Sequence, residues 1–413
     1  MKEWRAGMRL TMAEKGVLVK SFAPRYRKKG KKVKGEVLTE FTQMTGYNRC
    51  YGAYLLRHQG RRIRLSSKLV AVGDIGKKAG GQRARKYEQK VLKALKMIWK
   101  ILDYLCGKRL VAILPEVVPI LQRHGELKVD ADTRERLIQI SAATIDRLLA
   151  PERCKHRLKG RSGTKPGTLL KHQIPIKRFA DWQEDRPGFL EVDLVGHEGG
   201  QGRGDYCQTL DVTDVYTGWT EVRAVRNKAQ VWVLEAMKLL EKRSPFPWLG
   251  MASDNGSEFI NQHLIRFCEQ EEISFSRTRP SRKNDNPYVE QKNYSVVRRA
   301  VGYARYEGER ELELVNELYD RLRLQINFFK PVMKMVAKQR RGSRIWKKYD
   351  VPKTPYRRIC ESPEVAGKIK RELAQEYEKL NPAQLARQIG WLQNCLLLKL
   401  TPEQKKRWEA GWM

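Results

Sequence analysis

The chain has 413 residues, too many for one ordinary hydrophobic core, so we expect two to four domains. Hydrophobic residues make up 41% of it, which excludes a wholly disordered protein. The 83 lysines and arginines against 47 acids give a formal charge of +36, which favours a nucleic-acid partner over a ribosome-associated role or an acidic membrane surface.

The arrangement of the cysteines and the hydropathy of the sequence indicate the cellular compartment. The seven cysteines are scattered without CxxC pairs, which is typical of reduced intracellular thiols and not of a disulfide framework. The most apolar stretch, at 110–121, is interrupted by Pro115, Glu116 and Pro119 and is too short to cross a bilayer. We therefore expect a cytoplasmic protein with no membrane partner.

Residues 1–80 are predicted to form a basic arm followed by a helix-turn-helix DNA-binding domain. The arm, at 20–34, holds eight basic residues and no acid. Two short amphipathic helices then follow around a Thr45-Gly46 turn, and an ordinary helical hairpin is the alternative reading. Their apolar faces would be Val37, Leu38 and Phe41 on the first helix and Tyr51, Tyr54 and Leu55 on the second. The second helix would carry three side chains toward a DNA groove: Asn48, Arg49 and Arg57.

Residues 81–150 are predicted to form a second helical domain. The apolar spacing over 87–105 is strongly helical, and 133–149 gives another helical pair in which Ser141 caps the second helix. This block is either a second helix-turn-helix or a packing domain. Residues 151–184 have the basic, proline- and glycine-containing composition of a linker, which either tethers the domains or lies along a phosphate backbone.

Residues 185–330 change to an alternating pattern that predicts a mixed five-stranded sheet with helices packed on it. The segment 188–197 alternates like a half-buried strand, and two strands joined at Tyr216-Thr217-Gly218 follow it. Trp219 is expected to pack in the core or on this hairpin. A helix at 228–243 comes next, followed by a short strand before Asp254 and a second helix at 261–271. The segment ISFSRTRP is then predicted to be a strand, and 287–306 begins a long helix.

Three acids in this region have the positions that two-metal phosphodiester transfer requires. Asp193 lies mid-strand among apolar neighbours, where an acid is costly unless it binds metal or forms a buried salt bridge. Asp254 ends a strand, and Glu290, separated from it by 35 intervening residues, lies in the first helical turn after Pro287. Carboxylates are the ligands that Mg²⁺ prefers, and two ions can activate the nucleophile and stabilise the leaving oxygen. The sequence therefore predicts that these acids hold two Mg²⁺ or Mn²⁺ ions.

Other acids and one histidine compete for roles at this site. Asp211 is a possible accessory ligand, whereas Asp214 is expected to cap the hairpin turn. His197 either polarises a water or is a hydrogen-bonding surface histidine.

The segments FLEVDLVGH, SDNGSEF and KNDNPYVEQKN resemble the integrase core of DDE transposases and retroviral integrases. The resemblance covers about 185–330 and implies a ribonuclease H-like fold, with Asp193, Asp254 and Glu290 as catalytic metal ligands. The helical N-terminal blocks and the segment 327–358 resemble those of bacterial insertion-sequence transposases. The zinc-binding N-terminal domain of retroviral integrases is absent.

Basic residues surround the predicted site, and we expect them to contact the phosphates of the cut strand; a solvated helix face is the alternative. They are Arg282 and Lys283 before the catalytic glutamate and Lys292, Arg298 and Arg299 after it. Residues 331–413 are predicted to be a basic segment, either gripping phosphates or forming a surface loop, with a helical tail at 363–379 and 382–399. The apolar face of that tail would pack on the core or on another subunit.

Together these features predict a DDE transposase that binds element ends in double-stranded DNA and joins them to a target. It would act as a homo-oligomer, because two ends must be held together, and would lie at the bacterial nucleoid when bound. The alternatives are a catalytically inactive, domesticated DNA-binding protein derived from a transposase and a ribonuclease H-like nuclease that cuts without joining.

Overall fold

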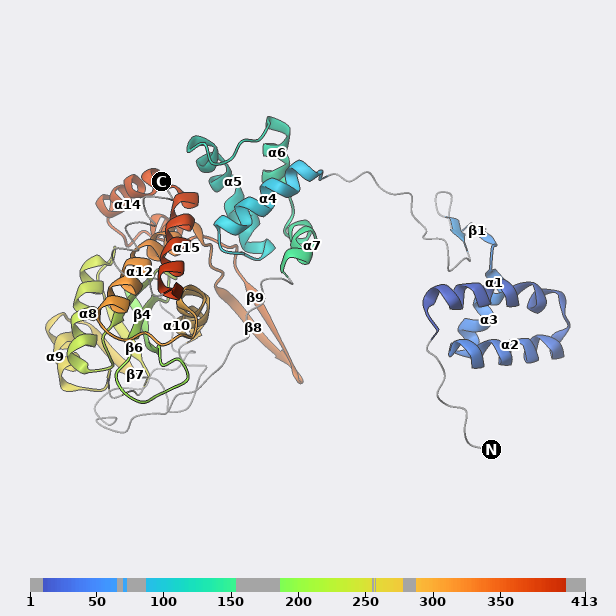
Figure 1. Cartoon of the computed structure of the whole chain (residues 1–413), viewed down its shortest axis with the longest axis horizontal. Coiled ribbons are helices and arrows are strands. Elements are labelled where there is room, and N and C mark those ends of the chain that lie inside the picture. Colours follow the sequence, from blue (N-terminus) through green and yellow to red (C-terminus); the bar gives the residue numbers. More distant parts are fainter. Residues whose placement is uncertain are drawn as a thin grey trace. The chain divides into compact units, whose positions relative to one another are not determined.

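The computed structural model describes residues 10–64, 70–72, 87–153, 186–254, 256, 258–277 and 287–398, drawn in colour in Figure 1. The chain divides into two compact units, Met1–Lys86 and Tyr87–Met413, and each is described by itself.

The first unit is a three-helix domain, followed by a short antiparallel pair of strands. Its elements are α1 (Met12–Lys28), α2 (Lys31–Thr45), α3 (Arg49–His58), β1 (Arg62–Arg64) and β2 (Val70–Val72). Thr11 begins α1 through a capping box with Glu14, and Gly46 ends α2 with a φ of 69°, as the predicted turn requires. Val37, Leu38 and Phe41 are buried as expected.

The prediction of a solvated arm at 20–34 is wrong, because residues up to Lys28 belong to α1 and those from Lys31 to α2. Phe22, Ala23 and Tyr26 of α1 are buried against α2 and α3. Lysines and arginines occupy the positions between them on the opposite face. Most of the basic residues from 20 to 28 therefore lie on the exposed face of an amphipathic helix.

The second unit begins with four helices, α4 (Gln89–Ile101), α5 (Gly107–Arg123), α6 (Ala131–Gln139) and α7 (Ala142–Arg153). Pro115 and Pro119 lie inside α5, where each removes a backbone hydrogen bond, yet the helix continues because one face of it is buried. The hydroxyl of Ser141 accepts a bond from Thr144 N at 3.3 Å and caps α7, as predicted. No helix in the described ranges is both long and apolar enough to cross a membrane.

The five-stranded sheet has the order β5-β4-β3-β6-β7. The strands β3 (Phe189–Gly196), β4 (Gln208–Asp214) and β5 (Thr220–Val225) form an antiparallel meander. The strands β6 (Gly250–Ser253) and β7 (Ser274–Arg277) extend it in parallel from β3, connected by α8 (Gln230–Arg243) and α9 (Gln262–Gln270). Asp214 caps the turn between β4 and β5, where Trp219 is buried. The predicted element order of the core is confirmed.

The chain after the sheet is mostly helical, apart from one hairpin. Its elements are α10 (Pro287–Lys292), the π-helical segment η3 (Asn293–Arg298), α11 (Arg299–Val301), α12 (Glu309–Phe329), β8 (Met335–Arg341), β9 (Arg344–Tyr349), α13 (Pro355–Glu361), α14 (Gly367–Lys379) and α15 (Pro382–Leu398). The predicted apolar face of α15, from Leu385 to Leu396, is buried against this chain's own core, including α12. The tail therefore packs on its own core.

The helices α4 and α5 are joined by ion pairs to the half of the unit that contains the five-stranded sheet. The Asp103 carboxylate accepts bonds from Arg299 at 2.5 Å and from Lys330 Nζ at 2.7 Å. Burial favours its neutral form, but those two cations outweigh burial and lower the pKa of Asp103. Glu116 of α5 pairs with Arg357 of α13 at 3.0 Å. Since apolar residues of both halves form one continuous cluster, helices and sheet share a core.

Candidate active site and nucleic-acid interface

Asp193 and Asp254 lie side by side at the edge where β3 and β6 run in parallel. The strand register pairs Val192 with Ser253, so the next residue along the chain from each of them is one of the two acids. Asp193 is half-buried and Asp254, at the strand end, is exposed. The backbone N–H of Gly256 donates to Asp254 Oδ1 at 2.9 Å and fixes the direction of that carboxylate over the turn that follows β6. The two acids thus occupy equivalent register positions on neighbouring parallel strands.

The charges of these acids repel one another. Burial raises the pKa of Asp193 to about 7, and the repulsion of Asp254 adds to the rise, with a smaller contribution from Glu290. Loss of hydration also raises the pKa of Asp254. Across the described ranges, neither aspartate has a lysine or arginine within salt-bridge distance. In the same ranges, no three His, Cys, Asp or Glu side chains lie close enough together to hold one ion.

Glu290 is exposed in the first turn of α10, whose start is held by a buried acid that sequence reasoning missed. Glu191 Oε2 accepts bonds from the backbone N–H groups of Tyr288 at 2.7 Å and Val289 at 2.9 Å. Burial raises the pKa of Glu191 to about 8 against the effect of those two bonds. Glu191 and Asp193 are two residues apart on one strand and share a face, which is the signal that could have identified the pair.

The first residue of the π-helical segment contacts the strand directly. Asn293 Nδ2 donates to Asp193 Oδ2 at 2.5 Å, while the backbone N–H of Leu194 donates to the other oxygen at 2.8 Å. Both oxygens of Asp193 therefore have fixed directions. Single π turns inside α-helices often occur at functional sites, because they shift side chains relative to the preceding turn. Here the shift follows Glu290 by three residues.

Lys292 does not reach the surface, contrary to the expectation that it tracks DNA phosphates. It is 8% exposed, and its Nζ donates to the carbonyl oxygen of Gly218 at 3.2 Å. Asp211, the residue opposite Asp193 in the β3–β4 ladder, is fully buried and interacts electrostatically with it. Burial raises the pKa of Asp211 and lowers that of Lys292, and each charge opposes the shift of the other. The lysine is an internal counter-charge in the core beneath the sheet's acids.

Arg298 and Arg299 are half-buried and are held by the protein itself. Arg298 donates to the carbonyl oxygen of Gly196 at 2.8 Å, and Arg299 pairs with Asp103. A phosphate would have to displace these partners, so they do not fit the expected contact with DNA phosphates, and their burial does not fit the alternative of a solvated helix face. Arg282 and Lys283 lie outside the described residues.

His197 is fully buried, so the prediction of a surface or water-polarising histidine is wrong. Its Nε2 lies 2.6 Å from Thr209 Oγ1, and its ring packs on Tyr306. Burial, reinforced by the charge of Arg298, lowers the pKa of His197 to about 3. The ring is a neutral core residue.

In the first unit, the three residues predicted to contact DNA differ in their roles. Asn48 caps α3, since its side chain accepts a bond from Cys50 N at 2.8 Å. Arg49 is exposed but ties α3 to α2, donating to Thr39 Oγ1 at 2.7 Å and to Gly35 O at 3.2 Å. Arg57 is exposed on the last turn of α3. Of the three, Arg57 is the one whose charge remains fully available to a ligand.

The exposed face of α3 also carries two aromatic residues that the sequence assigned to the core. Tyr51 and Tyr54 are 47% and 50% exposed, whereas Leu55 is buried as expected. Tyr54 packs on the ring of His58, with centroids 4.6 Å apart. Aromatic rings interleaved with cations suit a nucleic-acid surface.

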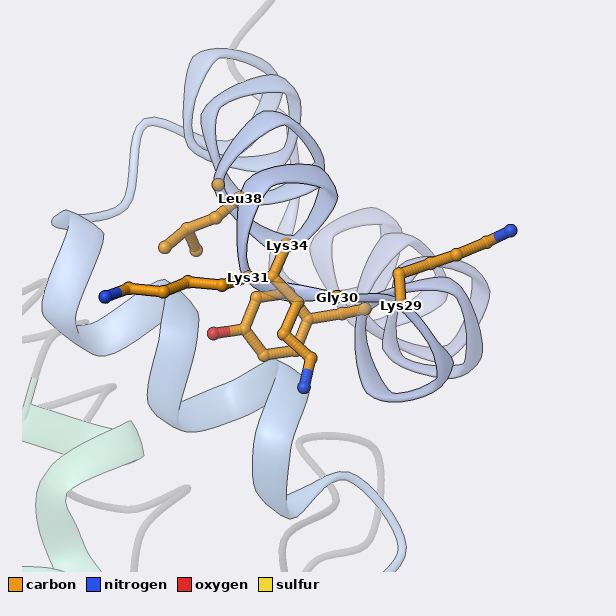
Figure 2. A pocket seen from close by; sticks show the side chains of 7 residues that line it. Lys29, Gly30, Lys31, Lys34 and Leu38 are labelled. Atoms are coloured by element: carbon orange, nitrogen blue, oxygen red, sulfur yellow. The ribbon is translucent and has the colours of Figure 1, made fainter.

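A shallow hollow at the junction of α1 and α2 is lined by lysines (Figure 2). Lys29 and Lys31 extend to opposite sides of it, with Lys34 between them, so their ammonium groups do not converge on one point. Tyr26 and Leu38 also line it. Spread cations suit an extended polyanion better than a single small anion.

Comparisons with known proteins identify the family of this fold. Residues 184–283 match the integrase core domain family, a range that contains Asp193 and Asp254 and ends before Glu290. The uncharacterized protein y4rM of Sinorhizobium fredii is 36% identical over 350 residues, which cover 85% of this chain and 96% of that protein.

Two solved integrase cores share lower similarity with this chain. The catalytic core of BIV integrase is 15% identical, with a TM-score of 0.29 over 46% of this chain and 98% of its own. The HTLV-2 integrase core, solved with magnesium, is 14% identical, with a TM-score of 0.27 over 35% of this chain and 90% of its own.

Proposed function

This chain belongs to the DDE transposase and integrase family of polynucleotidyl transferases, with a ribonuclease H-like core, and we propose that it is a transposase. In this proposal it binds the ends of a DNA element, cuts them and joins them to target DNA. Asp193, Asp254 and Glu290 are its catalytic residues and metal ligands.

The observation that carries the proposal is the placement of two mutually repelling acids on adjacent parallel strands, with a third acid, Glu290 of α10, near enough to repel Asp193. Such a cluster costs folding free energy, since each carboxylate raises the free energy of ionising its neighbour. Among the described residues, Asp193 and Asp254 lie together without a basic partner, and such an arrangement is favourable only when a cation binds there. A structural salt bridge, the alternative for Asp193, has no support among the described contacts.

The donor chemistry fits Mg²⁺ or Mn²⁺. All donors are hard carboxylate oxygens, and magnesium keeps several waters and binds through one or two carboxylates and substrate phosphates. Pairs of acids therefore suffice, and Asp193 interacts with Asp254 and with Glu290. Two ions, when bound, would activate the attacking hydroxyl and stabilise the leaving oxygen of an in-line displacement.

The chain's own contribution is to keep the ligand oxygens fixed. Asn293 and the Leu194 amide orient Asp193, the Gly256 amide orients Asp254, and Glu191 fixes the helix start from which Glu290 projects. Such pre-organisation contributes to rate because a ligand displaced by about 1 Å can cost on the order of 100-fold in rate.

Double-stranded DNA is the proposed partner, and the first unit is its proposed recognition module. Helix α3 follows a glycine turn and presents Tyr51, Tyr54 and Arg57 to solvent, as a recognition helix does. Because strand transfer joins two ends to one target, we also propose that the protein acts as a homo-oligomer on DNA.

The test is strand transfer of a labelled element end with Mg²⁺, comparing the parent protein with Asp193→Asn. We expect joining in the parent and at least a 1000-fold loss in the variant, with Asp205→Asn, an exposed acid in the same core, as the matched control. Mg²⁺ should raise the melting temperature of the parent and of the control, but hardly that of Asp193→Asn.

Three outcomes would change the proposal. Equal joining by parent and Asp193→Asn would exclude this active site. Cutting without joining would identify a nuclease, and DNA binding with neither reaction would identify an inactive DNA-binding protein.

A further inference from the structure

A two-stranded ribbon projects from the second unit, formed by β8 and β9 (Figure 1). Its strands pair with each other and with no other described strand. Gly342 and Ser343 form its two-residue turn, and the φ of Gly342, 60°, gives the left-handed geometry that such a tight turn needs. We call residues 335–349 the basic ribbon.

The basic ribbon has six lysines and arginines among its fifteen residues and no acid. The ladder places Lys338 directly opposite Lys347, and Arg341 opposite Arg344. Like charges directly opposite in a ladder destabilise it, and an isolated two-stranded hairpin is only marginally stable in water. In the described part of the chain, no acid lies within salt-bridge distance of Lys338 or Lys347. The ribbon therefore has an excess of positive charge that its own fold does not neutralise.

The ribbon also exposes large apolar side chains on both faces. Ile345 is 52% exposed and Trp346 is 62% exposed, and they lie on opposite faces because they are neighbours in one strand. Neither contributes to a buried cluster of the second unit. Within the described part of the second unit, neither their exposure nor the charge is explained by packing or ion pairing.

The base of the ribbon is held firmly against the catalytic core. Asp350 pairs with Arg358 of α13 at 2.7 Å and accepts a bond from the Lys334 amide at 2.7 Å. The Lys334 ammonium lies 4.5 Å from the ring centre of Tyr216, in the turn between β4 and β5. Gly218 of the same turn accepts the bond from Lys292, which lies two residues after Glu290. The ribbon is thus connected through one turn to the helix that carries the proposed catalytic glutamate.

We propose that the basic ribbon is a second duplex-DNA contact, which inserts into a groove and positions the DNA against the active site. This inference rests on the proposed function and adds a site to it. The major groove is about 12 Å wide and admits a two-stranded ribbon. Lys338 and Lys347 would neutralise phosphates on one face, and Trp346 would lie against the groove on the other. A polyanion removes the repulsion within the ladder, and this repulsion favours DNA over an apolar or basic protein partner.

The experiment measures binding of the full-length protein to a fluorescent duplex by anisotropy, over a series of salt concentrations and with EDTA present. The test variant is Lys338→Gln with Lys347→Gln. The matched control is Lys368→Gln with Lys379→Gln, two exposed lysines of α14. The slope of log affinity against log salt should decrease by about 1.8 in the test variant, since each lost phosphate contact removes about 0.9. The control slope should remain that of the parent. Removing like charges should not unfold the ribbon.

A second measurement places the contact directly. A photo-reactive benzoylphenylalanine in place of Trp346 should crosslink to the duplex, whereas the same group in place of exposed Leu397 should not.

The possible results are distinguishable. If the full-length protein binds duplex but the test variant keeps the parental slope, or if position 346 crosslinks only to a second copy of the chain, the ribbon proposal is wrong and the proposed function is unaffected. If the protein binds no duplex at all, both are wrong.

Discussion

Replacing Glu191 should reduce strand transfer without removing any proposed metal ligand. The Glu191 carboxylate is the acceptor for two backbone N–H groups at the start of α10, and the next residue along that helix is Glu290. In Glu191→Ala these N–H groups lose their acceptor. Because each buried unsatisfied N–H costs about 1–3 kcal/mol, the expected loss is roughly 2–6 kcal/mol at this position. The helix can avoid that cost by moving its first turn, which displaces Glu290.

The expected result is a fall in strand transfer of about 100-fold per folded molecule in Glu191→Ala. Glu191→Gln keeps a carbonyl oxygen that accepts both N–H groups, so its activity should remain within a few-fold of the parent. The matched control is Glu221→Ala, a buried acid of β5 that holds Trp219 and Arg323 but does not contact α10. It should lower stability by a similar amount and leave the activity of the folded fraction unchanged.

The assay pairs strand transfer with urea unfolding of each variant, so that activity is expressed per folded molecule. Two results would refute the reasoning. One is parental activity in Glu191→Ala, which would show that the two bonds do not position Glu290. The other is an equal loss in Glu191→Gln and Glu191→Ala, which would show that the charge of Glu191 matters and not its hydrogen bonds.

Three further predictions concern stability, electrostatics and recognition. The pKa of His197 falls from 6.5 to about 3 on folding, so the free energy of unfolding should decrease by about 1.4 kcal/mol per pH unit as pH falls below 6.5. His197→Gln should weaken the pH dependence of the urea unfolding midpoint between pH 4 and 7. Parallel plots of midpoint against pH for parent and variant would contradict this. Lys292→Met should lower the free energy of unfolding by about 3–5 kcal/mol, because it leaves Asp211 buried without its cation. Adding Asp211→Asn should recover part of that loss. Strictly additive changes in unfolding free energy would show that the two residues do not interact. Arg57→Ala should lower the slope of log affinity against log salt for DNA binding by about 0.9 and leave the melting temperature unchanged. Arg49→Ala should also lower the melting temperature of the first unit, because Arg49 ties α3 to α2. The opposite pattern would reverse the roles assigned to the two arginines.

The sequence by itself determined the order of elements in the core and the neighbourhood of Asp193 and Asp254. Alternating apolar residues identify a strand, and a strand that ends in an acid places that acid at a sheet edge. These signals are local, so they can be recognised without knowing which strands or helices pack against the segment. The turn at Gly46, the cap at Ser141 and the cap at Asp214 were predictable for the same reason, since each depends on the conformation of a few consecutive residues.

The tertiary structure alone decided which charged and aromatic side chains face solvent. Periodicity shows which residues share a face of a helix, but it does not show which partner covers that face. Lys292 points inward because buried Asp211, 81 positions earlier, lies near it, and Arg299 pairs with Asp103 on a helix pair nearly 200 residues away. Tyr51 and Tyr54 point outward because smaller residues of α3 fill the contact with α1 and α2. The role of Glu191 depends on the two N–H groups that α10 brings to it from nearly 100 residues away, and no local pattern contains that information.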